Sequence, residues 1–190
     1  MRDLILKEAV KQLKRGGYEN LSFTAISKTL DTSRANLHHH FSNKEGLAIA
    51  ATQSYINNNM ARLNEISLRH TGDFLGFVVE IEHMFIELIR SNGAKGMCIC
   101  SQLVREEGLP EELVVLSKRH FNDLISLFET QIKEAQHDGV IKSIIPPRKL
   151  AVQLWTIILG ILQMALTASD VEPYLDDMKG ILTNSVSYSA

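Results

Sequence analysis

Residues 33–40 carry the densest group of side chains that could recognise a nucleic acid. The segment reads Ser-Arg-Ala-Asn-Leu-His-His-His, and its polar members are Ser33, Arg34, Asn36, His38, His39 and His40. Short or planar polar groups of this kind can hydrogen-bond to base edges and to phosphates. Leu37 would anchor a helix along one edge and leave the polar sides open. The alternative interpretation is a solvated surface with no ligand.

The charge distribution favours an anionic partner for the same end of the chain. The 190 residues have a net charge of −2, but residues 1–50 hold eight Lys and Arg against five Asp and Glu, a net charge of +3. The remaining 140 residues hold twelve against seventeen, a net charge of −5. A basic segment on an acidic body is typical of a protein whose basic part meets something anionic.

Two Glu-x-x-His motifs offer a competing, enzymatic interpretation. Glu80 with His83 and Glu134 with His137 each place a carboxylate and an imidazole on one helix face. Two such motifs and two further glutamates can build a di-iron carboxylate site in a helical bundle. His137 lies close to Gly139, however, where solvent is expected, and Glu80, Glu82 and Glu87 lie opposite an apolar stripe. We therefore expect no catalytic residue, no metal site and no cofactor.

The compartment is predicted from the cysteines and the N-terminus. Cys98 and Cys100 are too close in sequence for a comfortable disulfide, so nothing requires an oxidising environment. Charges interrupt the apolar runs near the N-terminus, so no signal peptide is expected. These features predict a cytoplasmic protein.

Helical periodicity runs along almost the whole chain, which predicts an all-α protein of about nine helices. Glycine, proline and N-capping residues mark the boundaries, with Ser22 and Ser33 as caps and Ser42 or Asn43 as the next one. The expected helices cover about 2–15, 22–30, 33–39, a longer stretch after 43, 73–90, 97–106, 110–138 and 147–168, with a last helix starting near Pro173.

Residues 22–39 hold two short predicted helices separated by a break at Asp31-Thr32. This is the helix-turn-helix pattern, in which the second helix enters the major groove of DNA. The free amides at the N-termini of the two helices would favour phosphate.

The stretch from Gly17 to Leu47 resembles the TetR (tetracycline-repressor) family of bacterial regulators. It shares Gly-Tyr, Ser-Phe-x-x-Ile, Ser-x-x-x-Leu, an aromatic Phe41 and Lys-Glu-x-Leu with the family pattern. It departs from that pattern at four places, which are Ser27 for Ala, Asp31-Thr32 for Gly-Val, Ala35 for the second Gly and His38 for Tyr. Asp31 can adopt the left-handed conformation that glycine supplies, at some energetic cost.

The resemblance implies a DNA-binding head at residues 1–46 and a ligand-binding and dimerisation body at 47–190. It implies contacts of the head with double-stranded operator DNA, with Lys44 as a phosphate clamp. The implied DNA-binding residues are Ser22, Thr24, Lys28, Ser33, Arg34, Asn36, His38, His39 and Lys44. A head that has lost DNA binding and serves as a scaffold is an alternative.

The uncharged segment Leu150–Ser169 is long enough to span a bilayer. Four polar residues interrupt it, and a helix that is apolar all round can equally be buried in protein. The resemblance implies that the last two helices form a four-helix bundle with those of a second copy, so we expect a homodimer and no membrane contact. The expected interface stripe, which a single chain would struggle to cover, is Trp155, Ile158, Leu162 and Ala165.

The resemblance also implies a cavity that binds a small apolar or electrophilic inducer and thereby releases the operator. Plain core packing is the alternative for each lining residue. The candidates are Tyr55, Met60, Phe77, Met84, Phe85, His120, Phe121 and Phe128.

Cys98 is a candidate sensor thiol. The sequence Gly96-Met97-Cys98-Ile99 resembles a subgroup of the family that carries Gly-Cys-Leu at the start of its sixth helix, where a thiol can sense oxidants or electrophiles. A helix N-terminus lowers the pKa of a thiol, and Lys95 would add to this effect. The alternative is a small buried hydrophobic residue.

Overall fold

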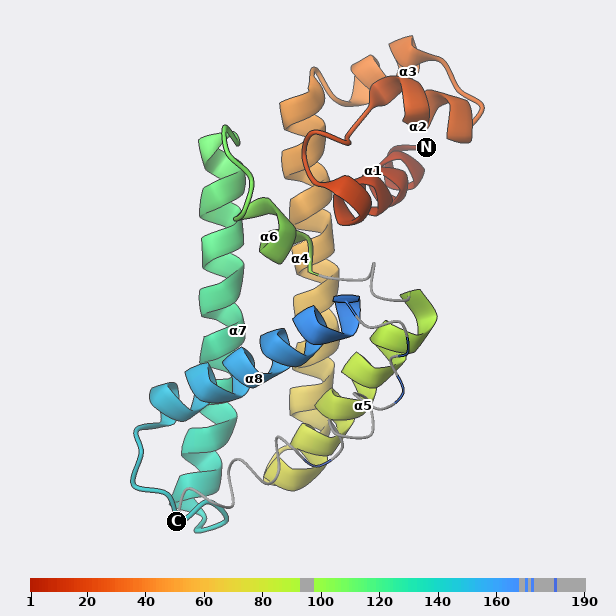
Figure 1. The fold of residues 1–190 in the computed structure, drawn as a ribbon. Helices are drawn as coiled ribbons and strands as arrows, with labels where there is room; N and C mark the ends of the chain where they lie inside the picture. The colour runs from red at the N-terminus through yellow and green to blue at the C-terminus, as the bar shows by residue number, and fades with distance from the viewer. Residues whose placement is uncertain (93–97, 168–169, 171, 173–179, 181–190) are drawn as a thin grey trace. The chain divides into compact units, whose positions relative to one another are not determined.

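The computed structural model describes residues 1–92 and 98–167, together with 170, 172 and 180. Within this part the chain is all α-helical, as predicted, and has no strand (Figure 1). The expected ninth helix near Pro173 lies outside the described residues. The eight helices are α1 (Arg2–Gly16), α2 (Phe23–Thr29), α3 (Arg34–His40), α4 (Lys44–Arg69), α5 (Phe74–Asn92), α6 (Ile99–Leu103), α7 (Glu111–His137) and α8 (Pro147–Thr167).

The predicted capping residues begin the helices of the head. The hydroxyl oxygens of Ser22 and Ser33 each accept a hydrogen bond from the amide three residues further on, at 3.3 and 3.1 Å. At the start of α4 the amide of Gly46 donates to Oδ1 of Asn43 at 2.8 Å, so Asn43 rather than Ser42 is the cap. Each cap satisfies an amide that the helix itself leaves without a partner.

Asp31 forms the turn between α2 and α3 in the predicted left-handed conformation. Its φ is +47°, and it is the only non-glycine residue with a positive φ in the part of the chain that is described. Asp tolerates this region better than most residues because its short side chain can hydrogen-bond locally. The turn therefore keeps the geometry of a helix-turn-helix without glycine.

The chain divides into two compact units, described separately below. The first comprises residues 1–59 and 97–121, and the second comprises 60–96 and 122–190. Helices α4 and α7 contribute residues to both. In the first unit α1 packs against α2 and α6, and α2 packs against α3. The fully buried side chains of this core include Ile5, Leu13, Ile26, Leu37, Leu47, Ile99, Leu103 and Leu113.

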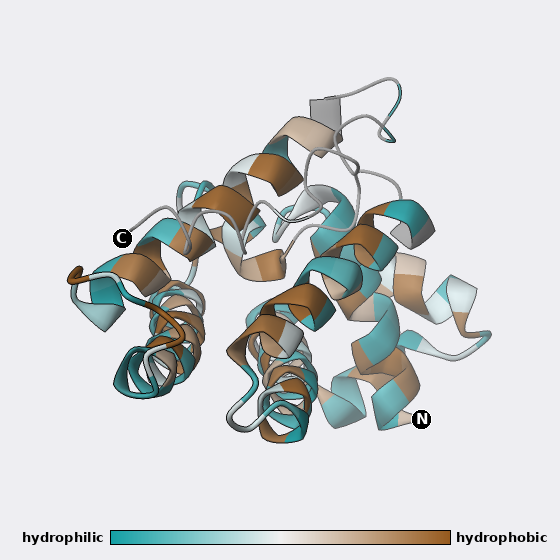
Figure 2. Cartoon of the chain, turned by 90° about the horizontal axis from the view of Figure 1, so that it is seen from below, coloured by the Kyte–Doolittle hydropathy of each residue, from teal (hydrophilic) through white to brown (hydrophobic). Residues whose placement is uncertain are grey.

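The second unit has an aromatic core. The ring of Phe128 lies 5.5 Å from that of Phe77 and 6.2 Å from that of Trp155, and Phe85 lies 6.2 Å from Trp155, between ring centroids. Such separations are typical of favourable aromatic packing. The helices expose polar residues on one side and bury apolar ones on the other, visible as alternating teal and brown along each ribbon (Figure 2).

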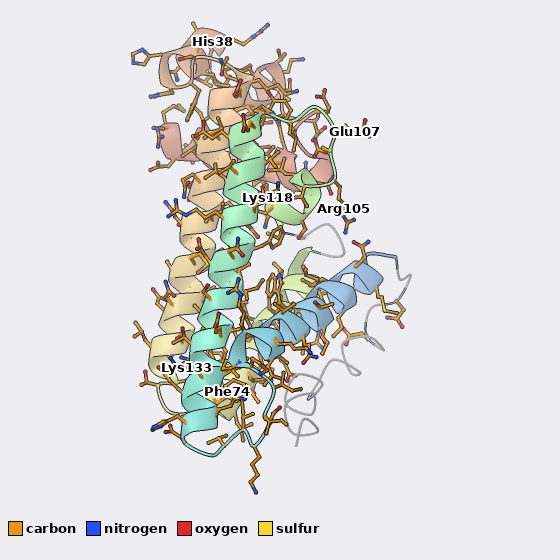
Figure 3. The ribbon with its side chains drawn as sticks, turned by 90° about the vertical axis from the view of Figure 1, so that its left-hand side faces the viewer. His38, Phe74, Arg105, Glu107, Lys118 and Lys133 are labelled. Carbon is orange, nitrogen blue, oxygen red and sulfur yellow. The ribbon has the colours of Figure 1, made fainter. Side chains whose placement is uncertain are left out.

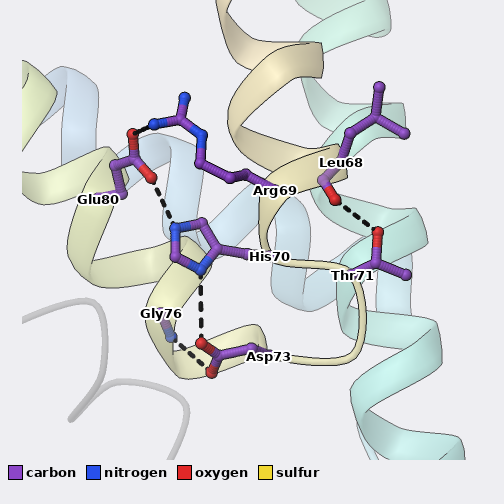
Figure 4. A network of polar contacts seen from close by, with 7 residues as sticks. All are labelled: Leu68, Arg69, His70, Thr71, Asp73, Gly76 and Glu80. Atoms are coloured by element: carbon purple, nitrogen blue, oxygen red, sulfur yellow. Dashed lines mark hydrogen bonds and ion pairs between the residues drawn. The ribbon is translucent and has the colours of Figure 1, made fainter.

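A polar network fixes the turn between α4 and α5 (Figure 4). Nε2 of His70 lies 2.6 Å from one carboxylate oxygen of Glu80, and Arg69 forms an ion pair with the other at 2.9 Å. On the opposite side of the ring, Nδ1 of His70 lies 3.4 Å from Asp73, which also accepts from the amide of Gly76 at 2.9 Å. These two bonds, that of the Gly76 amide first, lower the pKa of the Asp73 carboxyl.

The predicted interface stripe on α8 is buried within the single chain, which corrects our expectation. Trp155, Ile158, Leu162 and Ala165 are 7%, 0%, 8% and 1% exposed. Trp155 packs against the aromatic core of its own unit, so the prediction that one chain cannot cover these residues is wrong. The side of α8 that stays exposed carries Val152, Thr156 and Gly160. Within the described residues, no helix meets the length and hydropathy of a membrane span.

Candidate nucleic-acid interface

The side chains predicted to contact DNA lie at the surface of α2, α3 and the start of α4. Thr24, Lys28, Ser33, Arg34, His38 and His39 are exposed, and Ser22, Asn36 and Lys44 are half-buried. Leu37, by contrast, is fully buried and anchors α3 in the core of the first unit. The side chains of this part project outward in Figure 3, where His38 is labelled. The helix-turn-helix thus exposes a polar face and buries an apolar one.

Asn36 and His38 also make contacts within the DNA-binding head. Asn36 donates its side-chain amide to the hydroxyl of Thr32 at 3.0 Å, which ties α3 to the turn before it. The His38 ring stacks on Phe23 at 4.7 Å between centroids, with 27° between the planes, and its Nδ1 lies 3.4 Å from the carbonyl of Ser42. The His38 ring therefore joins α2 to α3.

Lys44 is held in place by contacts at the beginning of α4. Its ammonium donates to the carbonyl of Glu19 at 3.3 Å and lies 3.9 Å from that residue's carboxylate. It also lies 4.6 Å from the centroid of the Tyr18 ring, within the range of a cation–π contact. Burial, and then the charges of Glu45 and Glu19, raise the pKa of the Tyr18 hydroxyl. A positive charge is thus positioned beside the helix-turn-helix before any ligand arrives.

Comparison with known proteins agrees with this geometry. Residues 5–51 match the model of the family described as bacterial regulatory proteins, tetR family. The segment that contains α1, α2, α3 and the start of α4 is therefore similar to the N-terminal domain of that family. The match indicates that this segment is the DNA-binding domain of a transcriptional regulator. No curated relative matches it.

Solved structures of other proteins share the fold over nearly the whole length of the chain. A transcriptional regulator from Agrobacterium tumefaciens superimposes with a TM-score of 0.86 at 23% identity, covering 96% of both chains. The reduced form of NemR from E. coli gives 0.85 at 17% identity, with 97% of both chains covered. FadR from Bacillus subtilis, in complex with stearoyl-CoA, gives 0.77 at 18% identity, with 98% of both covered. At these identities the likeness establishes the fold.

The residues of the enzymatic alternative do not assemble into a metal site in the described part of the chain. Glu80 is engaged by His70 and Arg69, and His83 and Glu134 are exposed. His137 is exposed as well and contacts the neighbouring carboxylate at 3.0 Å. One correction concerns Glu82, which we expected on the solvated side but which is 4% exposed and accepts a hydrogen bond from the amide of Gly180 at 3.2 Å.

A cluster that sequence reasoning missed lies in the first unit. One ligand atom from each of Cys98, Cys100 and His120 lies within 4.8 Å of the other two. Cys100 and His120 are buried, and Cys98 is half-buried at the start of α6. The sequence analysis singled out Cys98 as a sensor and His120 as a cavity residue, because nothing local joins positions separated by 20 residues. Lys95, which it placed beside the thiol, lies outside the described residues.

The two thiols of the cluster have opposite pKa shifts. The neighbouring Cys100 thiol, and to a lesser degree His120 and Tyr55, hold the pKa of Cys98 well below its usual value, although burial opposes this. The Cys98 thiolate and then burial raise the pKa of Cys100. Burial raises the pKa of the Tyr55 hydroxyl, and Cys98 adds to the effect. Of the two thiols, Cys98 is therefore the one that loses its proton more readily.

The eight predicted cavity residues fall into both units. Tyr55 and His120 lie together in the first, 6.4 Å between ring centroids, with Phe121 adjacent to His120. Met60, Phe77, Met84, Phe85 and Phe128 belong to the second, where Phe77 and Phe128 are fully buried in the aromatic core. Their role as an inducer site remains a prediction.

The structure also has an open groove in the second unit, of about 740 Å³, that the sequence analysis did not anticipate. Most of the residues that line it are of polar or charged type, and they come from the turn before α5 and from the second half of α7. The lining residues are Thr71, Gly72, Ser126, Glu129, Thr130, Lys133, Glu134, His137 and Asp138.

The carboxylate of Glu106, after α6, binds the loop between α1 and α2. The backbone amide of Tyr18 donates to both carboxylate oxygens of Glu106, at 2.9 and 3.2 Å. Gly17, whose φ is +66°, makes room for this contact, since a Cβ there would collide with the Glu106 carboxylate. The segment after α6 is therefore bound directly to the loop that leads into α2.

Replacing Glu106 by alanine is expected to lower the free energy of unfolding by about 1–2 kcal/mol. The amide of Tyr18 would lose a charge-assisted hydrogen bond, discounted for its partial exposure. Urea denaturation measures the change. Glu107→Ala is the matched control, because Glu107 is exposed on the same connection (Figure 3). Equal midpoints for the two variants would contradict the role of Glu106.

Proposed function

We propose that the protein is a homodimeric, ligand-responsive repressor that acts in the cytoplasm on double-stranded operator DNA. The observation that carries the proposal is the helix-turn-helix of α2 and α3, with its turn at Asp31 and its exposed polar face. Residues 1–46 would be the DNA-binding head and 47–190 the ligand-binding and dimerisation body. In a dimer, two heads would enter successive major grooves.

A gel-shift experiment with the DNA upstream of the protein's own gene tests the proposed binding to operator DNA. Saturable binding that survives an excess of unrelated duplex at physiological salt is expected, because non-specific binding is much weaker there. Binding that competitor DNA removes completely would contradict a specific operator in that fragment.

The second part of the proposal is that a small molecule releases the protein from its operator. Two relatives of the same fold point to different ligand chemistry, because FadR is solved with stearoyl-CoA and NemR in a reduced form. Stearoyl-CoA is therefore the apolar probe and a quinone the electrophilic one, with Cys98 as the proposed target of the quinone. Either probe should lower operator affinity through coupling between the two sites. Equal affinity at saturating concentrations of both would contradict these inducer classes.

The dimer is proposed to use the exposed side of α8 rather than the stripe that we first predicted. Val152 is 42% exposed, and Thr156 and Gly160 follow it at intervals of four residues. A Cβ on Gly160 would meet no atom of the described structure within 4 Å, so the helix surface is open there. Small residues of this kind allow the backbone of a second helix to approach closely.

Gly160→Glu is expected to convert the dimer into monomers at micromolar concentration and to weaken operator binding. A charge would be buried at the centre of the contact without a partner, which is costly. Sedimentation velocity measures the change in mass. Leu68→Glu is the control, because Leu68 is 75% exposed on α4. A Gly160→Glu protein that sediments as the wild type does would contradict this interface.

A further inference from the structure

We propose that Cys98, Cys100 and His120 form a binding site for a thiophilic metal ion. The three residues come from two separate parts of the first unit, the start of α6 and the middle of α7. Their ligand atoms already lie within 4.8 Å of one another. The proposal stands on this geometry and needs neither the dimer nor the inducer described above.

The donor set selects the class of ion. Two sulfurs and one imidazole nitrogen are the ligands that Zn²⁺ and Cu⁺ prefer, whereas Mg²⁺ and Ca²⁺ require oxygen ligands. A tetrahedral Zn²⁺, with bonds of about 2.3 Å to sulfur and about 2.0 Å to nitrogen, holds its donors about 3.5–3.8 Å apart. The widest pair in the cluster would thus close by roughly 1 Å, which side-chain rotation can supply.

The burial and hydrogen bonding of His120 give an independent indication that the cluster can bind an ion. The residue is 1% exposed, and its Nδ1 has no hydrogen-bond partner. Its other nitrogen, Nε2, lies 3.4 Å from the side-chain amide of Asn59, which fixes the ring. A buried polar atom without a partner costs about 1–3 kcal/mol, which an ion bound at Nδ1 would offset. Metal binding at Nδ1 requires the proton on Nε2, and a flip of the Asn59 side-chain amide would let its Oδ1 accept from that N–H, as is typical of metal-binding histidines.

The charges around the cluster compensate that of the ion, and one of the three ligands is accessible to solvent. Two thiolates neutralise a divalent cation, so a Zn²⁺ site would add no net charge to the interior. Lys14 lies nearby, with its ammonium 5.1 Å from the centroid of the Tyr55 ring, and would offset the residual charge of a Cu⁺ site. Cys98 is half-buried, whereas Cys100 is fully buried. The ion would therefore enter past Cys98.

The proposed metal site lies next to the contacts that join α6 and Glu106 to the DNA-binding head. Helix α6 starts at the two cysteines and packs against α1. The connection that follows α6 carries Glu106, which binds the backbone at Tyr18. An ion that tightens the start of α6 would act on the element that holds the head. This coupling rests on the proposed function, while the site itself does not.

Metal titration of the reduced full-length protein under anaerobic conditions tests the site. Zn²⁺ is added in competition with a chromophoric chelator, Cu⁺ in a parallel series, and Co²⁺ as a spectroscopic probe of thiolate ligation. We expect one ion per chain, and a sulfur-to-cobalt charge-transfer band in the near ultraviolet. Cys98→Ser, Cys100→Ser and His120→Asn should each reduce the affinity by about 100-fold or more, since each removes a direct ligand.

The controls separate loss of a ligand from loss of the fold. His83→Asn makes the same substitution at an exposed histidine and should bind as the wild type does. Cys98 is half-buried, so Cys98→Ser should keep the circular dichroism spectrum and melting temperature of the metal-free protein. A wild type that binds no tighter than folded Cys98→Ser overturns the site. Binding that His120→Asn leaves unchanged overturns the three-residue ligand set.

A second measurement tests the coupling. Operator affinity is measured by fluorescence anisotropy with and without one equivalent of the ion that binds, and we expect at least a fivefold difference. Unchanged affinity with the ion bound would overturn the coupling to the head. Failure to bind DNA under either condition would instead contradict the proposed function, and the titration above would still decide the metal site.

Discussion

The Arg34→Ala protein is expected to bind its operator about 5- to 150-fold more weakly than the wild type. Arg34 is the first residue of α3 and is exposed, and the N-terminal residues of a recognition helix reach the base edges. A guanidinium that pairs with guanine through two hydrogen bonds contributes about 1–3 kcal/mol of discrimination against the wrong base. Truncation also removes one positive charge, which weakens binding to any duplex.

Fluorescence anisotropy with operator and with scrambled duplex separates these two effects. A base contact requires that the loss on operator exceed the loss on scrambled DNA. Arg62→Ala is the matched control, because it removes the same group from an exposed position outside the segment 5–51. Equal losses on both duplexes would mean that Arg34 contacts phosphate only.

Replacing Phe128 by alanine is expected to lower the free energy of unfolding by about 3–5 kcal/mol. Phe128 is 0% exposed and lies between Phe77 and Trp155 in the aromatic core. Removing a buried ring loses its transfer free energy and leaves a cavity that its neighbours fill only in part. A loss of this size is a large fraction of the stability of a typical domain.

Urea denaturation followed by tryptophan fluorescence measures this change, since Trp155, the single tryptophan of the chain, lies against Phe128. The control is Phe121→Ala on the same helix, where the ring is half-buried and the loss should be much smaller. Similar midpoints for the two variants would show that Phe128 does not form the centre of the core. They would instead favour a cavity open enough to accept a ligand.

Features coded by neighbouring residues could be predicted from the sequence. The caps at Ser22 and Ser33 and the left-handed turn at Asp31 depend on contacts within four residues, and the structure has all three. The boundaries of the longer helices agree within one or two residues for the same reason. The short helix predicted at 97–106 covers Ile99–Leu103, and beyond its C-terminal end Glu106 bonds to the distant amide of Tyr18 instead of continuing the helix.

Features that depend on distant contacts could not be predicted. An uncharged helix such as α8 does not reveal which side faces its own core, so we assigned Trp155 to a partner although Phe85 and Phe128 cover it. Similarly, nothing near Cys100 points to His120, which lies on another helix. In both cases the missing information is which helices pack together, and only the folded chain supplies it.

The contact between Glu106 and the loop at Gly17 sets a constraint on hybrid regulators. Such a hybrid would combine the DNA-binding head of one regulator with the body of another. A transplanted head with any side chain at position 17 would collide with Glu106, and a recipient without this carboxylate would leave the amide of Tyr18 unsupported. The two positions, 89 residues apart, would therefore have to be transferred together.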